Sequence, residues 1–374
     1  MIRRAVPARS RWLAAVGVLA LLGAPILVGS ATATGPTLPT ITPRPFASAS
    51  SSATPPQSKP DDIAHLNGNL YVTYQNGVGP DGSPSPTGVF QSTVVEYAPN
   101  GNVAQSWLLL GRCDGLGADP ANNRLLASVN EDNNSSLYSI TPGVADPLHL
   151  SYSPNPSQIA PGESSPNGGT DSIAVGPTGK VFIAHSNPDP GFPSTAATYT
   201  AQLKGTDALL EPLFNVDSRA KDVVTGKETK LALTDPDSNS LIPASAPTLG
   251  GTLLQDSQGD GIVVIVKNPS TKHPSLASLT LHNAETPSLQ PTIDDISEVT
   301  GPGTLYVVDQ GAGTVQTIDT AGFTPGTLVV AQPSDSTTNP PTTGQLGVLD
   351  PATGVITHFA NAFSSPKGLV FVAH

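Results

Sequence analysis

The chain has 374 residues and carries 29 acidic against 17 basic side chains, which gives a formal net charge of −12 at pH 7. A surface of this sign repels nucleic acids and anionic lipids, so binding to nucleic acid is excluded. The 36 glycines and 39 prolines interrupt the chain at short intervals, and no window shows sustained helical periodicity. The composition therefore favours an all-β protein.

Residues 1–33 have the features of a signal peptide. Four arginines and no acidic residue precede an apolar run over residues 12–29, and Ala31 and Ala33 provide a cleavage site of the small-x-small type. We therefore expect a secreted or cell-surface protein whose mature chain begins near Thr34. Because the apolar run approaches the ~20 residues needed to cross a bilayer, an uncleaved membrane anchor is the alternative.

Residues 34–59 consist mainly of threonine, proline, serine and alanine, with hardly a charge. Such a segment buries too little apolar surface to offset the entropy lost on ordering. We therefore expect a disordered linker here. The remaining residues, 60–374, suit one large domain.

A recurring unit organises this domain. In residues 292–320, three short β-branched runs are separated by Gly-Pro-Gly and Gly-Ala-Gly, which predicts three antiparallel strands joined by tight turns. Three other stretches, residues 60–74, 113–129 and 170–185, repeat its order of an acid, a polar residue or glycine, an aliphatic residue and a small residue, followed by a turn and a strand. The last stretch, residues 366–374, matches the same opening strand. The aligned aliphatic positions are Ile63, Leu116, Ile173, Ile296 and Leu369.

A small meander of this kind cannot bury both of its faces, so each unit needs a neighbour on either side. Radial repetition supplies these neighbours, and the sequence therefore predicts a six-bladed β-propeller of four-stranded antiparallel sheets, with five or seven blades as alternatives. The long interval between Ile173 and Ile296 is expected to contain a further unit. Pairing of residues 368–373 with the N-terminal part of the ring is expected to close it.

An acidic residue precedes the aligned position in each of the four clear units, and Lys367 takes its place in the closing strand. The inner strands of a propeller begin at one mouth of the central channel, so these carboxylates should converge there, and such a group suits a hard cation such as calcium. The alternative is structural, because aspartate before a strand often binds backbone N–H groups of a turn. The candidate metal ligands are Asp61, Asp114, Asp171 and Asp294.

The repeated order Pro-x-Asp/Gly-Ile/Leu-small, turn, Leu/Val-Tyr/Phe-Val/Ile resembles the NHL-type repeat and, more loosely, the gluconolactonase or senescence-marker-type propellers. The resemblance covers residues 60–374 in principle and implies a propeller scaffold. In the lactonase-like propellers a divalent metal lies at the channel mouth on acidic and amide side chains. The resemblance places this role on the four candidate aspartates.

Two further features were considered as sites. Asp235, Asp237 and Asn239 have the alternate spacing that opens a calcium-binding loop, but Ser240 stands where that loop needs glycine and Ala246 where it needs glutamate, so an EF-hand is rejected. An Asp-rich turn is expected instead, in the unit hidden before Ile296. The single cysteine, Cys113, excludes an intrachain disulfide and is expected to be a small buried hydrophobe, with a reactive thiol as the alternative.

Two functional hypotheses follow. The favoured one is a non-catalytic, monomeric binding module of the cell envelope or extracellular space, which takes a protein or carbohydrate ligand on loops over residues 76–90 and 153–169. The alternative is a metal-dependent hydrolase or lactonase, in which a divalent cation on the four aspartates activates water. The motifs specify a scaffold better than an activity, and this favours the binding module over the hydrolase.

Overall fold

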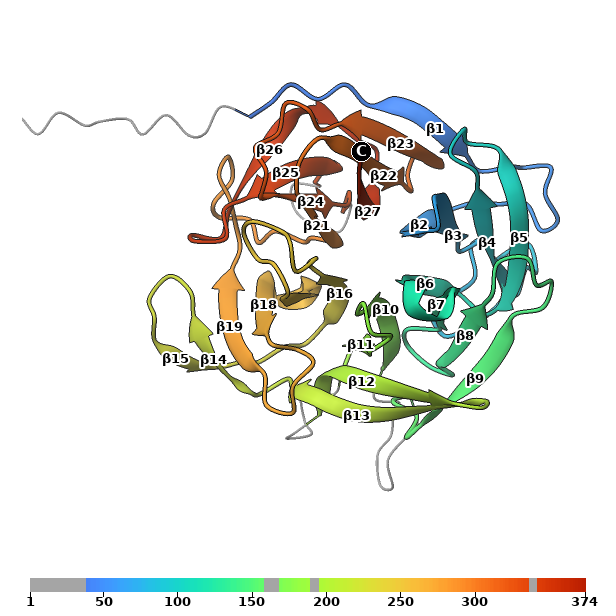
Figure 1. Ribbon diagram of the computed structural model, residues 1–374, viewed down its shortest axis with the longest axis horizontal. Coiled ribbons are helices and arrows are strands. Elements are labelled where there is room, and N and C mark those ends of the chain that lie inside the picture. Colours follow the sequence, from blue (N-terminus) through green and yellow to red (C-terminus); the bar gives the residue numbers. More distant parts are fainter. Residues whose placement is uncertain (1–37, 158–167, 189–194, 336–341) are drawn as a thin grey trace, which may run out of the picture. The chain divides into compact units, whose positions relative to one another are not determined.

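The computed structural model describes residues 38–157, 168–188, 195–335 and 342–374, and residues Leu38–His374 form one compact unit. The expected signal peptide lies outside the described residues and stays a prediction. Along the described part of the chain, no helix is both long and apolar enough to cross a membrane. The fold is all-β with a β-propeller arrangement, as Figure 1 shows.

Six strands surround the central axis, and each contacts the next until the ring closes (Figure 1). Five of them carry the aligned aliphatic residues. The sixth lies in the long interval between Ile173 and Ile296, where residues 236–241 form a strand and the Asp-rich turn expected there is wrong. In ring order the six strands are β2 (Pro60–Leu66), β6 (Cys113–Asp119), β10 (Gly169–Val175), β16 (Pro236–Leu241), β21 (Asp295–Val299) and β27 (Pro366–Ala373).

Each inner strand begins a sheet whose other strands lie further from the axis. The first sheet is β2-β3-β4-β5, with β3 (Asn69–Tyr74), β4 (Gln91–Tyr97) and β5 (Val103–Leu110). An eight-stranded sheet follows, in the order β10-β11-β12-β13-β9-β8-β7-β6. Its other strands are β7 (Arg124–Val129), β8 (Ser136–Ile140), β9 (Leu148–Ser153), β11 (Val181–Ser186), β12 (Ala196–Lys204) and β13 (Asp207–Asn215), and the 3₁₀ helix η1 (Pro120–Asn122) lies between β6 and β7.

The next sheet has six strands in the order β15-β14-β19-β18-β17-β16. It contains β14 (Arg219–Asp222), β15 (Glu228–Lys230), β17 (Leu253–Ser257), β18 (Ile262–Lys267) and β19 (Ser275–Thr280), with the 3₁₀ helix η2 (Gln258–Asp260) between β17 and β18. The five-stranded sheet β20-β26-β25-β24-β21 contains β20 (His282–Asn283), β24 (Thr327–Gln332), β25 (Gln345–Leu349) and β26 (Val355–Ala362). The last sheet, β1-β23-β22-β27, contains β1 (Arg44–Ser48), β22 (Gly303–Asp309) and β23 (Thr314–Asp319).

These sheets correct the expectation of separate four-stranded sheets, because only two of the five sheets have four strands. The outer strands β9 and β13 pair in parallel, with Ser151 beside Asp207, and this joins two antiparallel meanders into the eight-stranded sheet. The strands β14 and β20 pair in parallel with the outer strands β19 and β26. Each addition satisfies backbone groups at an edge that would otherwise be open.

The closing sheet contains both ends of the described chain. Its innermost strand is β27 and its outermost is β1, so residues 44–48 are part of the propeller. The expected disordered linker over residues 34–59 is therefore wrong for this strand, where Ala47 is buried because it packs beside Val315 on β23.

The expected three-stranded meander over residues 292–320 is also wrong. The strands β22 and β23 form a hairpin, but β21 pairs with β24 in the neighbouring sheet. The place beside β22 is taken by β27, with Leu369 opposite Val307. The chain therefore leaves the five-stranded sheet after β21, forms β22 and β23 in the sheet that contains β27, and returns to the five-stranded sheet at β24. The order of strand-like segments along the sequence does not show this crossing.

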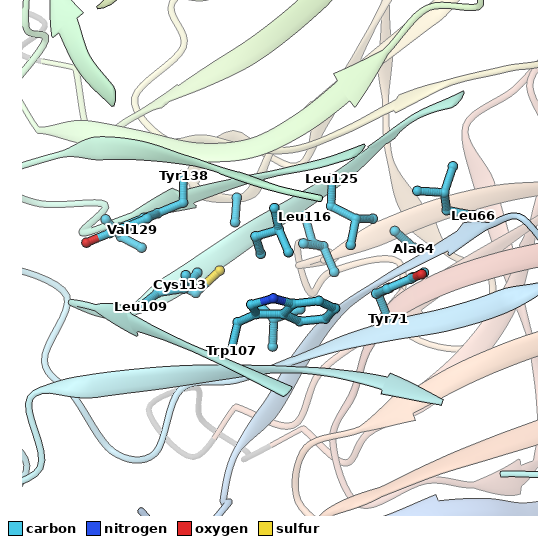
Figure 2. Close-up of a cluster of buried hydrophobic side chains, with 13 residues drawn as sticks. Ala64, Leu66, Tyr71, Trp107, Leu109, Cys113, Leu116, Leu125, Val129 and Tyr138 are labelled. Atoms are coloured by element: carbon cyan, nitrogen blue, oxygen red, sulfur yellow. The ribbon is translucent and has the colours of Figure 1, made fainter. Parts of the chain in front are cut away.

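Apolar side chains fill the spaces between neighbouring sheets. Successive residues of a strand point to opposite faces, so Leu125 on β7 packs in one cluster while Leu126 packs in the next. Figure 2 shows one such layer, in which Trp107 from β5 and Tyr71 from β3 lie close to Cys113 and Leu116 from β6. Cys113 is free and fully buried, which confirms that it is a small core residue.

Candidate functional site

Local irregularities at the start of the inner strands aim side chains into the channel. In the first sheet Pro60 pairs with Tyr74 and Ile63 with Val72, so that Asp61 and Asp62 lie opposite the single residue between them. A bulge of this kind turns the extra side chains out of the regular alternation. The same register shift occurs in the pairs β6–β7, β10–β11, β16–β17 and β27–β22.

The four predicted aspartates line one cavity of about 190 Å³ at this mouth of the channel. Nine of its lining residues are acidic and two, Arg112 and Lys367, are basic. The sequence therefore predicted correctly that the acidic residues converge. The loop over residues 76–90 follows the end of β3, where Tyr74 pairs with Pro60, and so emerges on the same face.

Sequence reasoning missed one member of this group. Asp237 follows the first residue of β16 as Asp61 follows the first residue of β2, and it lines the same cavity. The signal was present in the segment Pro-Asp-Ser-Asn. Asp237 was assigned to an Asp-rich turn because Asn239 stands where the five aligned stretches have isoleucine or leucine. Asn239 instead donates a hydrogen bond to the carbonyl of Ser172 at 3.3 Å.

Lys367 occupies the sixth position of the ring. Its ammonium nitrogen forms an ion pair with Asp294 and lies 3.8 Å from Oδ1 of Asp61. Burial works against the charged form, but the carboxylates of Asp294 and Asp61 outweigh it and raise the pKa of Lys367 well above its ordinary value. The ring thus already holds an ammonium ion between two of its aspartates.

Arg112 supplies the second positive charge. Its guanidinium lies 2.9 Å from Oδ1 of Asp114 and 2.5 Å from Oε1 of Glu131. The two basic groups therefore stand beside Asp114 on one side of the cavity and between Asp61 and Asp294 on another. No arginine or lysine is recorded in an ion pair with Asp171 or Asp237 among the described residues.

Glutamine side chains orient three of the carboxylates. Gln75 donates to Asp114 at 2.7 Å, Gln310 donates to Asp61 at 2.8 Å, and Gln258 donates to Asp294 at 3.3 Å. Oδ2 of Asp114 is buried and has no hydrogen-bond partner among the described residues. A buried carboxylate oxygen without a donor is costly, so this atom is a place where a ligand's N–H group would be favourable.

The protonation of the cavity reflects its excess of acid. Burial, opposed by Lys367 and aided by Asp294, raises the pKa of Asp61 to about 6. Burial and neighbouring carboxylates raise the pKa values of Asp114, Asp171 and Asp237 well above their ordinary range. For both Asp171 and Asp237 burial is the largest cause, and each is also surrounded by other carboxylates. The charged forms of these groups are therefore disfavoured unless a positive charge enters the cavity.

Two further aspartates of the cavity have a different role. Oδ2 of Asp62 accepts the N–H of Leu116 at 2.6 Å, and Oδ2 of Asp295 accepts the N–H of Leu369 at 2.6 Å. Each carboxylate therefore ties one inner strand to another. The backbone-binding role that the sequence offered as an alternative is thus played by these two residues. Burial raises the pKa of Asp295 to about 7, against the lowering effect of its hydrogen bonds.

The donor set of the cavity consists of carboxylate oxygens, which suit a hard cation. However, nowhere in the described ranges do three or more His, Cys, Asp or Glu side chains group in a way that could hold a metal ion. The ammonium of Lys367 lies between two of the four predicted ligands. As arranged here, the residues do not fit a metal, and the metal role of Asp61, Asp114, Asp171 and Asp294 stays a prediction.

Comparison with solved structures gives similarities at low sequence identity. The chain resembles a periplasmic gluconolactonase of Pseudomonas aeruginosa with 13% identity and a TM-score of 0.48, over 85% of this chain and 89% of the other. It resembles a chain of a nidogen/laminin complex with 10% identity and a TM-score of 0.45, over 84% of this chain and 86% of the other. For a streptogramin B lyase the values are 10% and 0.42, over 88% and 94%.

No family model matches the sequence, and no curated protein matches it. The similarities above concern the course of the backbone. The roles of the residues follow from the geometry of this chain.

Proposed function

We propose that this protein is a non-catalytic binding module that holds a positively charged group of its ligand in the acidic cavity at the channel mouth. The observation that supports this is the convergence of Asp61, Asp114, Asp171, Asp237 and Asp294 on one cavity with only two basic residues. Carboxylates that must otherwise bind protons gain most from a cation, because it replaces the proton without leaving charges unpaired.

The favoured ligand group is an alkylammonium, as found on a small amine or on a lysine side chain of a peptide. Lys367 provides the pattern, since its ammonium already pairs with Asp294 near Asp61. The pair Asp171 and Asp237, with Oδ2 of Asp114, offers a second set of acceptors to which no described basic residue is bound. An ammonium has three N–H donors and can serve several acceptors at once.

The alternative is the metal-dependent hydrolase or lactonase, with a divalent cation such as calcium on the predicted aspartates. The oxygen donors favour it, but Lys367 and the absence of a three-ligand group in the described ranges do not. We therefore derive no catalytic step through a metal. Metal analysis of the purified protein and melting curves with calcium or a chelator test this alternative directly.

The binding proposal is tested by calorimetric titration with methylammonium and, in a separate arm, with calcium. Methylammonium should bind more tightly as the pH rises from 5 to 8 and should release protons, because it competes with them for the carboxylates. The variant Asp171→Asn should weaken binding, whereas Asp207→Asn on exposed β13 should not. If methylammonium releases no heat at any pH, or if only calcium binds, the proposal is wrong.

Three finer statements belong to this proposal. Counting the eight-stranded sheet as two units, each with its own inner strand, supports a six-bladed propeller with NHL-type repeats. The signal-like residues 1–33 support export to the cell envelope or extracellular space. The protein is proposed to act as a monomer, which sedimentation of the purified mature chain would test.

A further inference from the structure

A second cavity, of about 470 Å³, lies at the end of the five-stranded sheet and is lined from β20, β24, β25 and β26. We call it the His358 cavity, after the histidine of β26 that lines it. Small-molecule sites typically occupy about 300 to 1,000 Å³ and combine apolar walls with a few converging polar groups. The His358 cavity falls in this range.

A chain of hydrogen bonds runs along its wall. Oε2 of Glu285 lies 2.8 Å from Nδ1 of His358, and Oε1 of the same carboxylate accepts the backbone N–H of His358 at 3.2 Å. The other ring nitrogen contacts the side-chain amide of Gln332, which donates to Oδ1 of Asn283 at 3.2 Å. Four side chains from three segments are thereby fixed in relation to one another.

The two ends of this chain differ in exposure. The side chain of Glu285 is 49% exposed and that of His358 is 9% exposed, while Gln332 and Asn283 are buried. Only the carboxylate is thus widely accessible, and its position is set by two bonds to His358. Such preorganisation is characteristic of a binding group, because little conformational entropy is lost in ordering the carboxylate when a ligand binds. A carboxylate that served only solubility would need no such support.

The other walls define the rest of the ligand. Leu289 and Pro291 contribute apolar surface, and Gln345 and Thr292 contribute neutral polar groups. Apart from Glu285 and His358, none of the described lining residues is charged. A ligand that offers hydroxyl donors to a carboxylate and an apolar face to aliphatic side chains fits this combination.

We infer that the His358 cavity binds a saccharide, with a sugar hydroxyl donating to Glu285. The inference is independent of the cation site. Gln290 lines the His358 cavity and donates to the carbonyls of Gly259 and Gln258 at 2.9 and 3.3 Å, while Gln258 lines the acidic cavity. These residues form a wall between the two cavities, which share no lining residue.

Saturation-transfer NMR with glucose, galactose, mannose and N-acetylglucosamine tests this inference. At least one sugar should receive saturation from the protein. The variant Glu285→Gln should lower its affinity about tenfold or more, because a hydrogen bond to a charged acceptor is lost. Leu289→Ala, which leaves the hydrogen-bond chain intact, should also weaken binding, whereas Glu228→Gln on exposed β15 should not.

Two outcomes would overturn the inference: no transfer to any of the four sugars, or transfer that Glu285→Gln and Leu289→Ala leave unchanged. The variant Asp171→Asn separates this result from that of the cation site. It should weaken methylammonium binding without altering sugar binding. A loss of sugar binding in Asp171→Asn would place the sugar in the acidic cavity and would also overturn the inference.

Discussion

Replacing Asp61 by asparagine should stabilise the protein at pH 8 and leave its stability at pH 4 almost unchanged. Burial raises the pKa of Asp61 from 3.8 to about 6, so the folded state keeps a proton that the unfolded chain releases as the pH passes 4. The stability linked to this proton is fully present below pH 4 and is lost as the pH rises through 6. The change in pKa corresponds to about 3 kcal/mol.

The asparagine variant has no charge at this position, so it escapes this loss. The difference in unfolding free energy between variant and wild type should therefore grow from near zero at pH 4 to about 3 kcal/mol at pH 8. Urea denaturation followed by the fluorescence of buried Trp107 measures it at each pH.

Asp207→Asn, an exposed substitution at the start of β13, serves as the control. A variant less stable than wild type at pH 8, or a difference that does not change with pH, would refute the reasoning. The first result would mean that the pairing of Asp61 with Lys367 and Gln310 outweighs its burial.

Three further substitutions test the surroundings of the cavity. Asp256→Ala should raise the melting temperature at pH 8. Both oxygens of this buried carboxyl lack hydrogen-bond partners among the described residues, and their burial costs about 1 to 3 kcal/mol. A lower melting temperature would contradict this. Gly115→Ala should destabilise the protein by about 1 to 3 kcal/mol in urea, because its Cβ would lie 2.4 Å from the carbonyl oxygen of Asp171; unchanged stability would show that the ring yields easily. Lys367→Met should lower the melting temperature at pH 8, because it leaves the carboxylates of Asp61 and Asp294 without their ammonium partner. It should also tighten methylammonium binding, because the competing ammonium is gone. Weaker methylammonium binding would contradict that competition.

The features that the sequence predicted well depend on short stretches of chain. Ile63, Leu116, Ile173, Ile296 and Leu369 all lie on inner strands. The first four follow an acidic residue and then a polar residue or glycine, and Lys367 replaces the acid before Leu369. The convergence of the aspartates then follows from the symmetry of the ring, which brings equivalent positions together. The repeated sequence pattern and the circular arrangement of the inner strands were together sufficient to predict that these aspartates converge.

The features that the sequence did not predict depend on contacts between segments that are distant along the chain. Strand β21 lies next to β22 in sequence but pairs with β24, because β27 takes the place beside β22. Glu131 stands outside the repeat pattern, and the pairing of β6 with β7 brings it beside Arg112 and Asp114. The His358 cavity likewise joins residues 73 positions apart, Glu285 and His358, and neither position recurs in the repeat.

The geometry also separates two roles that the sequence combined. Aspartate at the first of the two positions before the aligned aliphatic residue, as in Asp61, Asp114 and Asp294, contacts other side chains. Aspartate at the second position, Asp62 and Asp295, accepts backbone N–H groups and joins inner strands. The joining of inner strands explains the second set. It does not explain the first set, whose members contact glutamine and lysine side chains in the acidic cavity. The proposed cation site accounts for their convergence.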